Sequence, residues 1–153
     1  MMTQMEIRLD RLESIEAIKN LKAKYCHYCD QNYDPEGLAS LFTEDAVWDA
    51  GEKFGRYKGK EAIKGFFAGI SKDISFAAHL TMNPVIDVDG NMAKGEWRIF
   101  MPATMNDSQA AWLLAKYDEV YVRENNAWLI KDLKANIQFF APYDKGWAIQ
   151  QFM

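Results

Sequence analysis

Residues that bind metals or carry out redox chemistry are scarce in this chain of 153 residues. It contains two cysteines, Cys26 and Cys29, and two histidines, His27 and His79. A structural zinc site takes about four such ligands at suitable spacing, so we expect no metal. The cysteines have the C-x-x-C spacing of redox motifs, but they lie inside a helical pattern, whereas a thioredoxin-like pair begins a helix after a strand. We therefore expect two buried, reduced thiols.

Excess positive charge and long apolar runs are also missing. The formal net charge of −4 does not favour a surface that binds nucleic acid or anionic lipid. No apolar run is long enough to cross a bilayer, and residues 1–8 lack the apolar core of a signal peptide. The chain carries no cofactor-binding motif. We expect a cytoplasmic protein that binds neither nucleic acid nor membrane and uses no cofactor.

Apolar and aromatic residues, in contrast, are plentiful. Hydrophobic residues make up 49% of the chain and aromatic residues 14%, enough to form a core and to line a cavity. Residues 25–30, Tyr-Cys-His-Tyr-Cys-Asp, form the most unusual stretch. A surface helix rarely carries so many large half-polar groups, and a sealed core rarely accepts a carboxylate such as Asp30. We expect this stretch to form the mouth or wall of a pocket.

Apolar residues in the first half of the chain recur mostly at helical spacing. Residues 7–28 carry an apolar stripe that includes Leu9 and Leu12, which predicts a long helix. Pro35 should begin a second, short helix with Asp34 as its N-cap. The other elements expected here are a turn at 43–45, a strand at 46–50, a loop at 51–59 and a helix at 60–71.

Strand patterns dominate the second half. Alternation of side chains predicts strands at 75–83, 85–88, 92–104, 111–123 and 127–140, with turns at 89–91 and 124–126. Helices followed by meandering strands indicate one α+β domain over residues 1–153, with N-terminal helices packed on a strongly curved antiparallel sheet that encloses an apolar pocket. The strand that holds Trp112 and Tyr117 is apolar on both faces. We therefore expect its outer face to meet a second copy of the chain.

The order of these elements, together with several short segments, resembles the SnoaL-like branch of the nuclear-transport-factor-two-like superfamily. The segments are Ile-Lys-Asn-Leu-Lys-Ala-Lys-Tyr at 18–25, Asp30, Leu-Phe-Thr-Glu-Asp-Ala-Val-Trp at 41–48, Gly-Arg-Tyr-Lys-Gly-Lys-Glu-Ala-Ile at 55–63 and Trp-Leu-Ile at 128–130. The resemblance covers nearly the whole chain and implies a cone-shaped, cystatin-like α+β roll. It specifies the fold more closely than the reaction, because this scaffold hosts many functions.

Within the superfamily, the pattern is most similar to the group that includes scytalone dehydratase, the bile-acid dehydratase and the hexachlorocyclohexane dehydrochlorinase. That group has an aspartate at the end of its first helix and a histidine on a strand after its third helix, and Asp30 and His79 match these positions. Tyr25 matches a tyrosine of the bile-acid dehydratase. The resemblance implies a cofactor-independent lyase of the dehydratase type. It also implies self-association as a trimer, although dimers are common elsewhere in the superfamily.

The chain departs from the group at three places. Scytalone dehydratase has a second histidine where this chain has Met-Pro-Ala at 101–103. Its pocket tyrosine falls near Ala50, and the arginine of other members falls near Ile137 or Gln138. The base therefore matches while the groups that would polarise the substrate differ, which leaves the substrate open.

The matched residues suit the abstraction of a proton from carbon. The imidazole of His79 is a base near neutral pH, and Asp30 would fix its tautomer and stabilise the imidazolium. One of Tyr25, Tyr28 and Tyr33, with Tyr25 preferred, would donate a hydrogen bond to a carbonyl or a leaving hydroxyl. We expect a small apolar substrate that is cyclic or similar to a polyketide or steroid. The residues expected to line its pocket are Trp48, Asp49, Phe54, Trp97, Met101, Trp112 and Phe140.

Two other classes of function fit the same residues. Asp49 lies in a Trp-Asp-Ala-Gly stretch similar to the one that holds the base of ketosteroid isomerases, which indicates an isomerase or a polyketide cyclase. The fold also occurs in proteins that only bind a small ligand or act as assembly subunits. Contact between Asp30 and His79 inside a pocket would separate the lyase from these alternatives.

Overall fold

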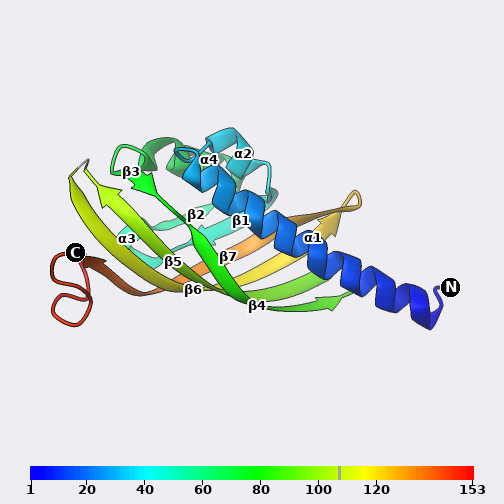
Figure 1. Ribbon diagram of the computed structural model, residues 1–153. Coiled ribbons are helices and arrows are strands. Elements are labelled where there is room, and N and C mark those ends of the chain that lie inside the picture. Colours follow the sequence, from blue (N-terminus) through cyan, green and yellow to red (C-terminus); the bar gives the residue numbers. More distant parts are fainter. Residues whose placement is uncertain (107) are drawn as a thin grey trace.

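The structure is a computed structural model that describes residues 1–106 and 108–153, and in them helices pack against one curved sheet (Figure 1). The helices are α1 (Gln4–Asp30), α2 (Pro35–Ala39), α3 (Gly51–Phe54) and α4 (Lys60–Ile70). The strands are β1 (Phe42–Asp49), β2 (Arg56–Lys58), β3 (Ile74–Ala77), β4 (Leu80–Asp89), β5 (Met92–Met105), β6 (Gln109–Glu124) and β7 (Ala127–Pro142). The predicted α+β fold class is confirmed.

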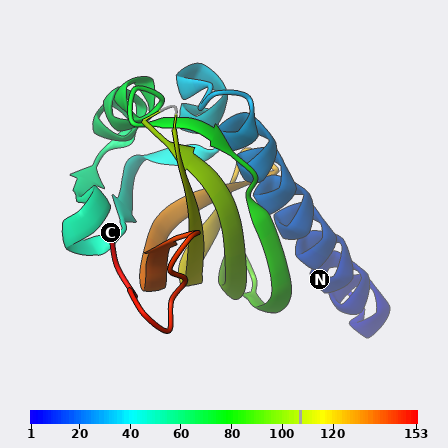
Figure 2. The same cartoon turned by 60° about the vertical axis from the view of Figure 1, so that its left-hand side comes forward.

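The sheet is mixed and curls into a half-barrel, as Figure 2 shows from the side. Its strand order is β2-β1-β7-β6-β5-β3, and β4 also pairs with β5. Among the described strands, β1 and β7 pair in parallel, whereas the remaining pairs are antiparallel as expected. No hairpin joins β1 to β7, because β2 to β6 lie between them in sequence. The connection between the two strands is therefore long enough for a parallel pair, which a short hairpin cannot form.

The long helix predicted at the N-terminus is confirmed, but its apolar stripe is buried only in part. A capping box between Thr3 and Glu6 begins α1. The helix extends beyond the sheet at its N-terminal end (Figure 1), so Leu9 and Leu12 are 52% and 64% exposed. From Ile18 onward the stripe packs on the core.

Two local predictions in the first half are wrong. The expected turn at 43–45 belongs to β1, which pairs with β7 across a register shift between Phe42 and Val47. The expected loop at 51–59 contains α3 and β2. In β1, pairing with β7 supplies backbone partners that override the turn preference of the polar residues there. The predicted cap of α2 is confirmed, because the backbone N–H of Gly37 donates to Asp34 Oδ1 at 3.1 Å.

The strand predicted at 75–83 is divided in two, and this break positions a functional side chain. β3 pairs with β5 through Ala77, and β4 pairs with β5 from Leu80 onward. Residues 78–79 connect them outside both strands. The predicted break at Pro84 is wrong, because β4 continues through it. Pro84 falls at a register shift, where the missing N–H is tolerated.

Candidate functional site

His79 lies in the break between β3 and β4, directly against the end of α1. Its ring Nδ1 is 2.8 Å from Asp30 Oδ1, and its backbone N–H donates to the same oxygen at 2.9 Å. The His79 side chain is 7% exposed, whereas that of Asp30 is 37% exposed. One carboxylate oxygen of Asp30 thus fixes the position of both the backbone and the ring of His79. With Nδ1–H donating to Asp30, Nε2 is the nitrogen left to accept a proton.

The chain reaches this arrangement through a left-handed turn after α1. Asn32 and Tyr33 have φ values of 58° and 56°, and the Tyr33 N–H donates to the Cys29 carbonyl at 3.1 Å. A left-handed backbone at a bulky aromatic residue costs about 1–3 kcal/mol. The turn brings the Tyr33 ring edge-on to His79, with centroids 5.7 Å apart, and nearly parallel to Phe67.

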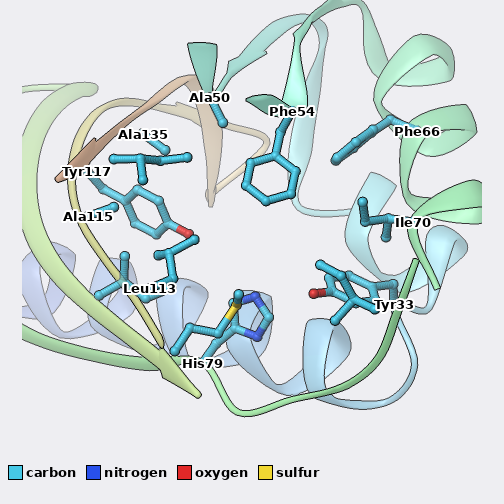
Figure 3. Close-up of a pocket in the computed structure, with 14 residues that line it drawn as sticks. Tyr33, Ala50, Phe54, Phe66, Ile70, His79, Leu113, Ala115, Tyr117 and Ala135 are labelled. Atoms are coloured by element: carbon cyan, nitrogen blue, oxygen red, sulfur yellow. The ribbon is translucent and has the colours of Figure 1, made fainter. Parts of the chain in front are cut away.

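An apolar cavity adjoins His79 between the helices and the inner face of the sheet (Figure 3). Its polar side chains are Tyr33, His79 and Tyr117. The free volume is about 50 Å³, which holds only a few water molecules. A ring-shaped ligand would therefore need lining side chains to move apart. The apolar lining includes Phe54, Phe66, Ile70, Met101, Leu113 and Ile137.

Two tyrosine hydroxyls point into this cavity from opposite sides (Figure 3). Burial raises the pKa of Tyr33 and of Tyr117 well above its ordinary range, and in both cases the nearby Cys29 adds to the shift. Both residues are therefore neutral at physiological pH. Among the residues that the structure describes, neither hydroxyl has a hydrogen-bond partner in the protein. Each can therefore donate to an oxygen of a bound molecule.

Tyr25, predicted as the third member of the site, lies elsewhere. It is buried in the core, where its ring packs edge-on against Phe42, Phe67 and Tyr117. Its hydroxyl accepts a hydrogen bond from Trp48 Nε1 at 3.0 Å. Neither Tyr25 nor Trp48 lines the cavity formed by the described residues. Tyr25 lies more than one helical turn before Asp30, and its hydroxyl is bonded to Trp48 in the core and does not face the cavity beside His79.

Of the other predicted lining residues, Phe54 and Met101 line the cavity and four do not. Trp97 is buried away from the cavity and donates from Nε1 to the Tyr121 hydroxyl at 2.9 Å. Trp112 lies on the outer face of the sheet and stacks on Tyr143. Alternation along β6 places it opposite Tyr117, so these two residues cannot face the same space.

Asp49 and Phe140 line a neighbouring surface groove. Asp49 Oδ1 accepts a hydrogen bond from the Gly51 N–H at 3.0 Å, and Oδ2 lies 3.7 Å from Arg56 Nε. The carboxylate therefore closes a local turn before α3, and it is not among the side chains that line the cavity beside His79. The structure thus places the base of the isomerase or cyclase alternative in this groove and not in the cavity beside His79.

Tyr117 is the functional candidate that sequence reasoning missed, and Tyr33 is the one that it ranked below Tyr25. A partial signal existed for Tyr117, because strand alternation places it on the inward face of β6 with Leu113 and Ala115. Nothing in that alternation distinguishes a core residue from one that faces a cavity. The orientation of Tyr33 depends on a left-handed backbone that its sequence does not predict.

The described residues contain no group of three or more His, Cys, Asp and Glu side chains arranged to hold a metal ion. Cys26 and Cys29 are buried thiols, and Cys26 Sγ lies 3.4 Å from Thr81 Oγ1. In the same part of the chain, no helix combines the length and the apolar character needed to cross a membrane.

Residues 10–134 match the family model of the SnoaL-like domain. The chain belongs to this family. The SnoaL-like fold is shared with solved structures of dehydrochlorinases. A hexachlorocyclohexane dehydrochlorinase, LinA type 2, is 25% identical with a TM-score of 0.82, and the match covers 88% of this chain and 92% of that one. LinA type 3 from Novosphingobium barchaimii LL02 is also 25% identical, with a TM-score of 0.80 and coverage of 88% and 93%.

Two further structures extend the comparison. A candidate scytalone dehydratase from Novosphingobium aromaticivorans is 25% identical, with a TM-score of 0.79 over 86% of this chain and 89% of that one. A protein from Nostoc punctiforme with a cystatin-like fold is 17% identical, with a TM-score of 0.66 and coverage of 89% and 93%, which supports the fold alone. No curated protein sequence matches the chain significantly.

Proposed function

We propose that this SnoaL-like protein catalyses a cofactor-independent elimination of the dehydratase type on a small apolar cyclic molecule. The observation that carries the proposal is the Asp30–His79 pair, whose imidazole adjoins an apolar cavity. The structural similarity to dehydrochlorinases and to a candidate dehydratase supports the same class of reaction.

In this mechanism His79 Nε2 takes a proton from a carbon that lies beside an electron-withdrawing group. Asp30 accepts the hydrogen bond from Nδ1–H, which keeps Nε2 unprotonated and stabilises the imidazolium that forms. The apolar lining excludes water and strengthens this electrostatic contribution. No redox step occurs, so the reaction needs no electron carrier.

The test is a screen of cyclic hydroxy ketones and halogenated ring compounds for loss of water or halide. Any substrate found is then assayed with His79→Ala, with Asp30→Asn and with His27→Ala as the matched control. His27 is exposed and bonds to Gln31, so its loss should leave turnover unchanged. A general base contributes about 10²–10⁴-fold, and kcat of His79→Ala should fall by that order. Asp30→Asn should cost as much or less.

We also propose that the chain self-associates through the outer face of the sheet, as a trimer. Exposed apolar side chains lie on β3 and β4, where Phe76, Leu80 and Val85 are each at least half exposed. Phe100 and Trp112 continue the apolar surface on β5 and β6. An apolar surface of this kind is typical of an interface between subunits.

A further inference from the structure

The N-terminal half of α1 extends beyond the core, and one of its faces is tied to the sheet (Figure 1, Figure 2). The Arg123 guanidinium on β6 donates two hydrogen bonds to Asp10, the shorter at 2.7 Å. Arg11 pairs with Asp87 on β4 at 3.1 Å. These contacts orient the projecting part of the helix, so its other face has a defined direction.

That other face carries an apolar stripe, which we call the outer stripe and which consists of Met5, Leu9 and Leu12. Each of the three side chains is more than half exposed. At about 100° per residue, the outer stripe lies roughly on the opposite side of the helix from Ile18, which is fully buried in the core. The intervals of four and three residues are those of the d and a positions of a coiled coil. The spacing therefore fits a contact with another helix.

Charged residues flank the outer stripe in a pattern that favours a parallel pair of identical helices. With Leu9 at position a, Arg8 occupies position g, and Glu6 and Glu13 occupy position e. A parallel pair brings a g residue next to the e residue of the following heptad on the other helix, so Arg8 meets Glu13 of a second copy. An antiparallel pair brings e positions together, and here both are glutamates. Within the part of the chain that the structure describes, Arg8 and Glu13 form no ion pair, in contrast to the inward-facing charges of the same helix.

We infer that α1 binds α1 of a second copy, side by side and in parallel, through the outer stripe and two Arg8–Glu13 ion pairs. The outer stripe faces away from the sheet, so this contact leaves the outer face of the sheet free for the proposed trimer. Three layers make a short coiled coil. The helix contact therefore forms at higher protein concentration than the sheet contact. It does not depend on which reaction the protein catalyses.

Disulfide trapping tests both the contact and its direction. In a parallel pair, residue 5 faces residue 5 of the second copy, so Met5→Cys should form a disulfide-linked dimer when oxidised glutathione accepts the two electrons. Gln4→Cys is the matched control, because residue 4 is equally exposed but points about 100° away from the outer stripe. It should form no dimer above the wild-type background. The native Cys26 and Cys29 are buried and should not contribute.

Charge reversal tests the flanking ion pairs by sedimentation equilibrium from micromolar to millimolar concentration. Arg8→Glu should weaken self-association of the helix by about 2- to 30-fold, as expected for the loss of two exposed ion pairs. Glu13→Arg should have the same effect. An equimolar mixture of the two variants should regain the wild-type affinity, because each helix then presents the charge that the other lacks.

Removal of the outer stripe tests the apolar contact in the same measurement. Leu9→Gln/Leu12→Gln should prevent the rise in particle mass with concentration, while α1 stays helical by circular dichroism because Leu and Gln have similar helix propensities. Ile149→Gln is the matched control, because it removes an exposed aliphatic side chain in the C-terminal segment, at the opposite end of the molecule (Figure 1). It should leave the mass unchanged.

The outcomes separate the helix contact from the proposed trimer and from the proposed reaction. A trimer that persists in Leu9→Gln/Leu12→Gln, together with a wild-type mass that rises above it, would support two independent contacts. Equal masses of wild type and this variant at every concentration would overturn the inference. A disulfide-linked dimer from mixed Met5→Cys and Leu9→Cys proteins, but from neither alone, would show an antiparallel pair and would also overturn it.

Discussion

Lys22 is the residue whose replacement should destabilise this protein most clearly. Its ammonium and the Glu119 carboxylate form an ion pair in which both side chains have no solvent exposure. Glu119 also accepts a hydrogen bond from the Tyr121 hydroxyl, which in turn accepts one from Trp97 Nε1. Replacing Lys22 with Met would leave the Glu119 charge buried with Tyr121 as its remaining partner.

The magnitude follows from the cost of an uncompensated buried charge. Removing one member of a buried pair costs about 3–5 kcal/mol. For a domain of this length, 1 kcal/mol shifts Tm by about 2–4 °C, so Lys22→Met should lower Tm by about 6–20 °C. Helix propensity contributes little, because Lys and Met have similar values. The double variant Lys22→Met/Glu119→Gln should recover much of the loss, since Gln is uncharged and keeps a donor and an acceptor.

The assay is urea unfolding followed by circular dichroism. Lys19→Met is the matched control, because Lys19 lies on the same helix in an exposed pair with Glu16 at 3.6 Å. An exposed pair of this kind is worth about 0–1 kcal/mol. If Lys22→Met lost no more stability than Lys19→Met, the buried network would not have the role described. A double variant less stable than Lys22→Met would also contradict the reasoning.

Two further predictions concern alkaline pH and assembly. Burial raises the pKa of Cys29 and of Tyr117 well above their ordinary values of 9.0 and 10.0, so the unfolded chain loses these protons first as pH rises. Their contribution to stability is complete below pH 9.0 and declines above it. The midpoint of urea unfolding should therefore fall as pH rises above 9.0. A midpoint that stayed constant above pH 9.0 would argue against their burial. Light scattering at micromolar concentration should show a trimer, and a purely monomeric protein would refute the proposed interface.

The fold was largely predictable, because helical and strand periodicity are local properties that burial reinforces. The Asp30–His79 contact was also predicted, although the residues are far apart in sequence, because their positions match a family pattern. The geometry shows why the pair meets: β3 ends at Ala77, and residues 78–79 leave the sheet beside the end of α1. Periodicity alone predicted a continuous strand there.

The remainder of the site depended on packing that the sequence does not encode locally. Tyr25 and Tyr117 are both buried tyrosines whose rings touch, yet only the Tyr117 hydroxyl faces the cavity. Which of two neighbouring aromatic residues borders empty space depends on how the whole sheet curls. The parallel pairing of β1 with β7 has the same origin, because it joins elements from opposite ends of the chain.

The most direct test of the central claim is kcat of His79→Ala against that of His27→Ala on a dehydration substrate. The account predicts a loss of about 10²–10⁴-fold for His79→Ala, an intact fold by circular dichroism and no loss for His27→Ala. Turnover by folded His79→Ala at the wild-type rate would show that the Asp30–His79 pair is not the base of this protein.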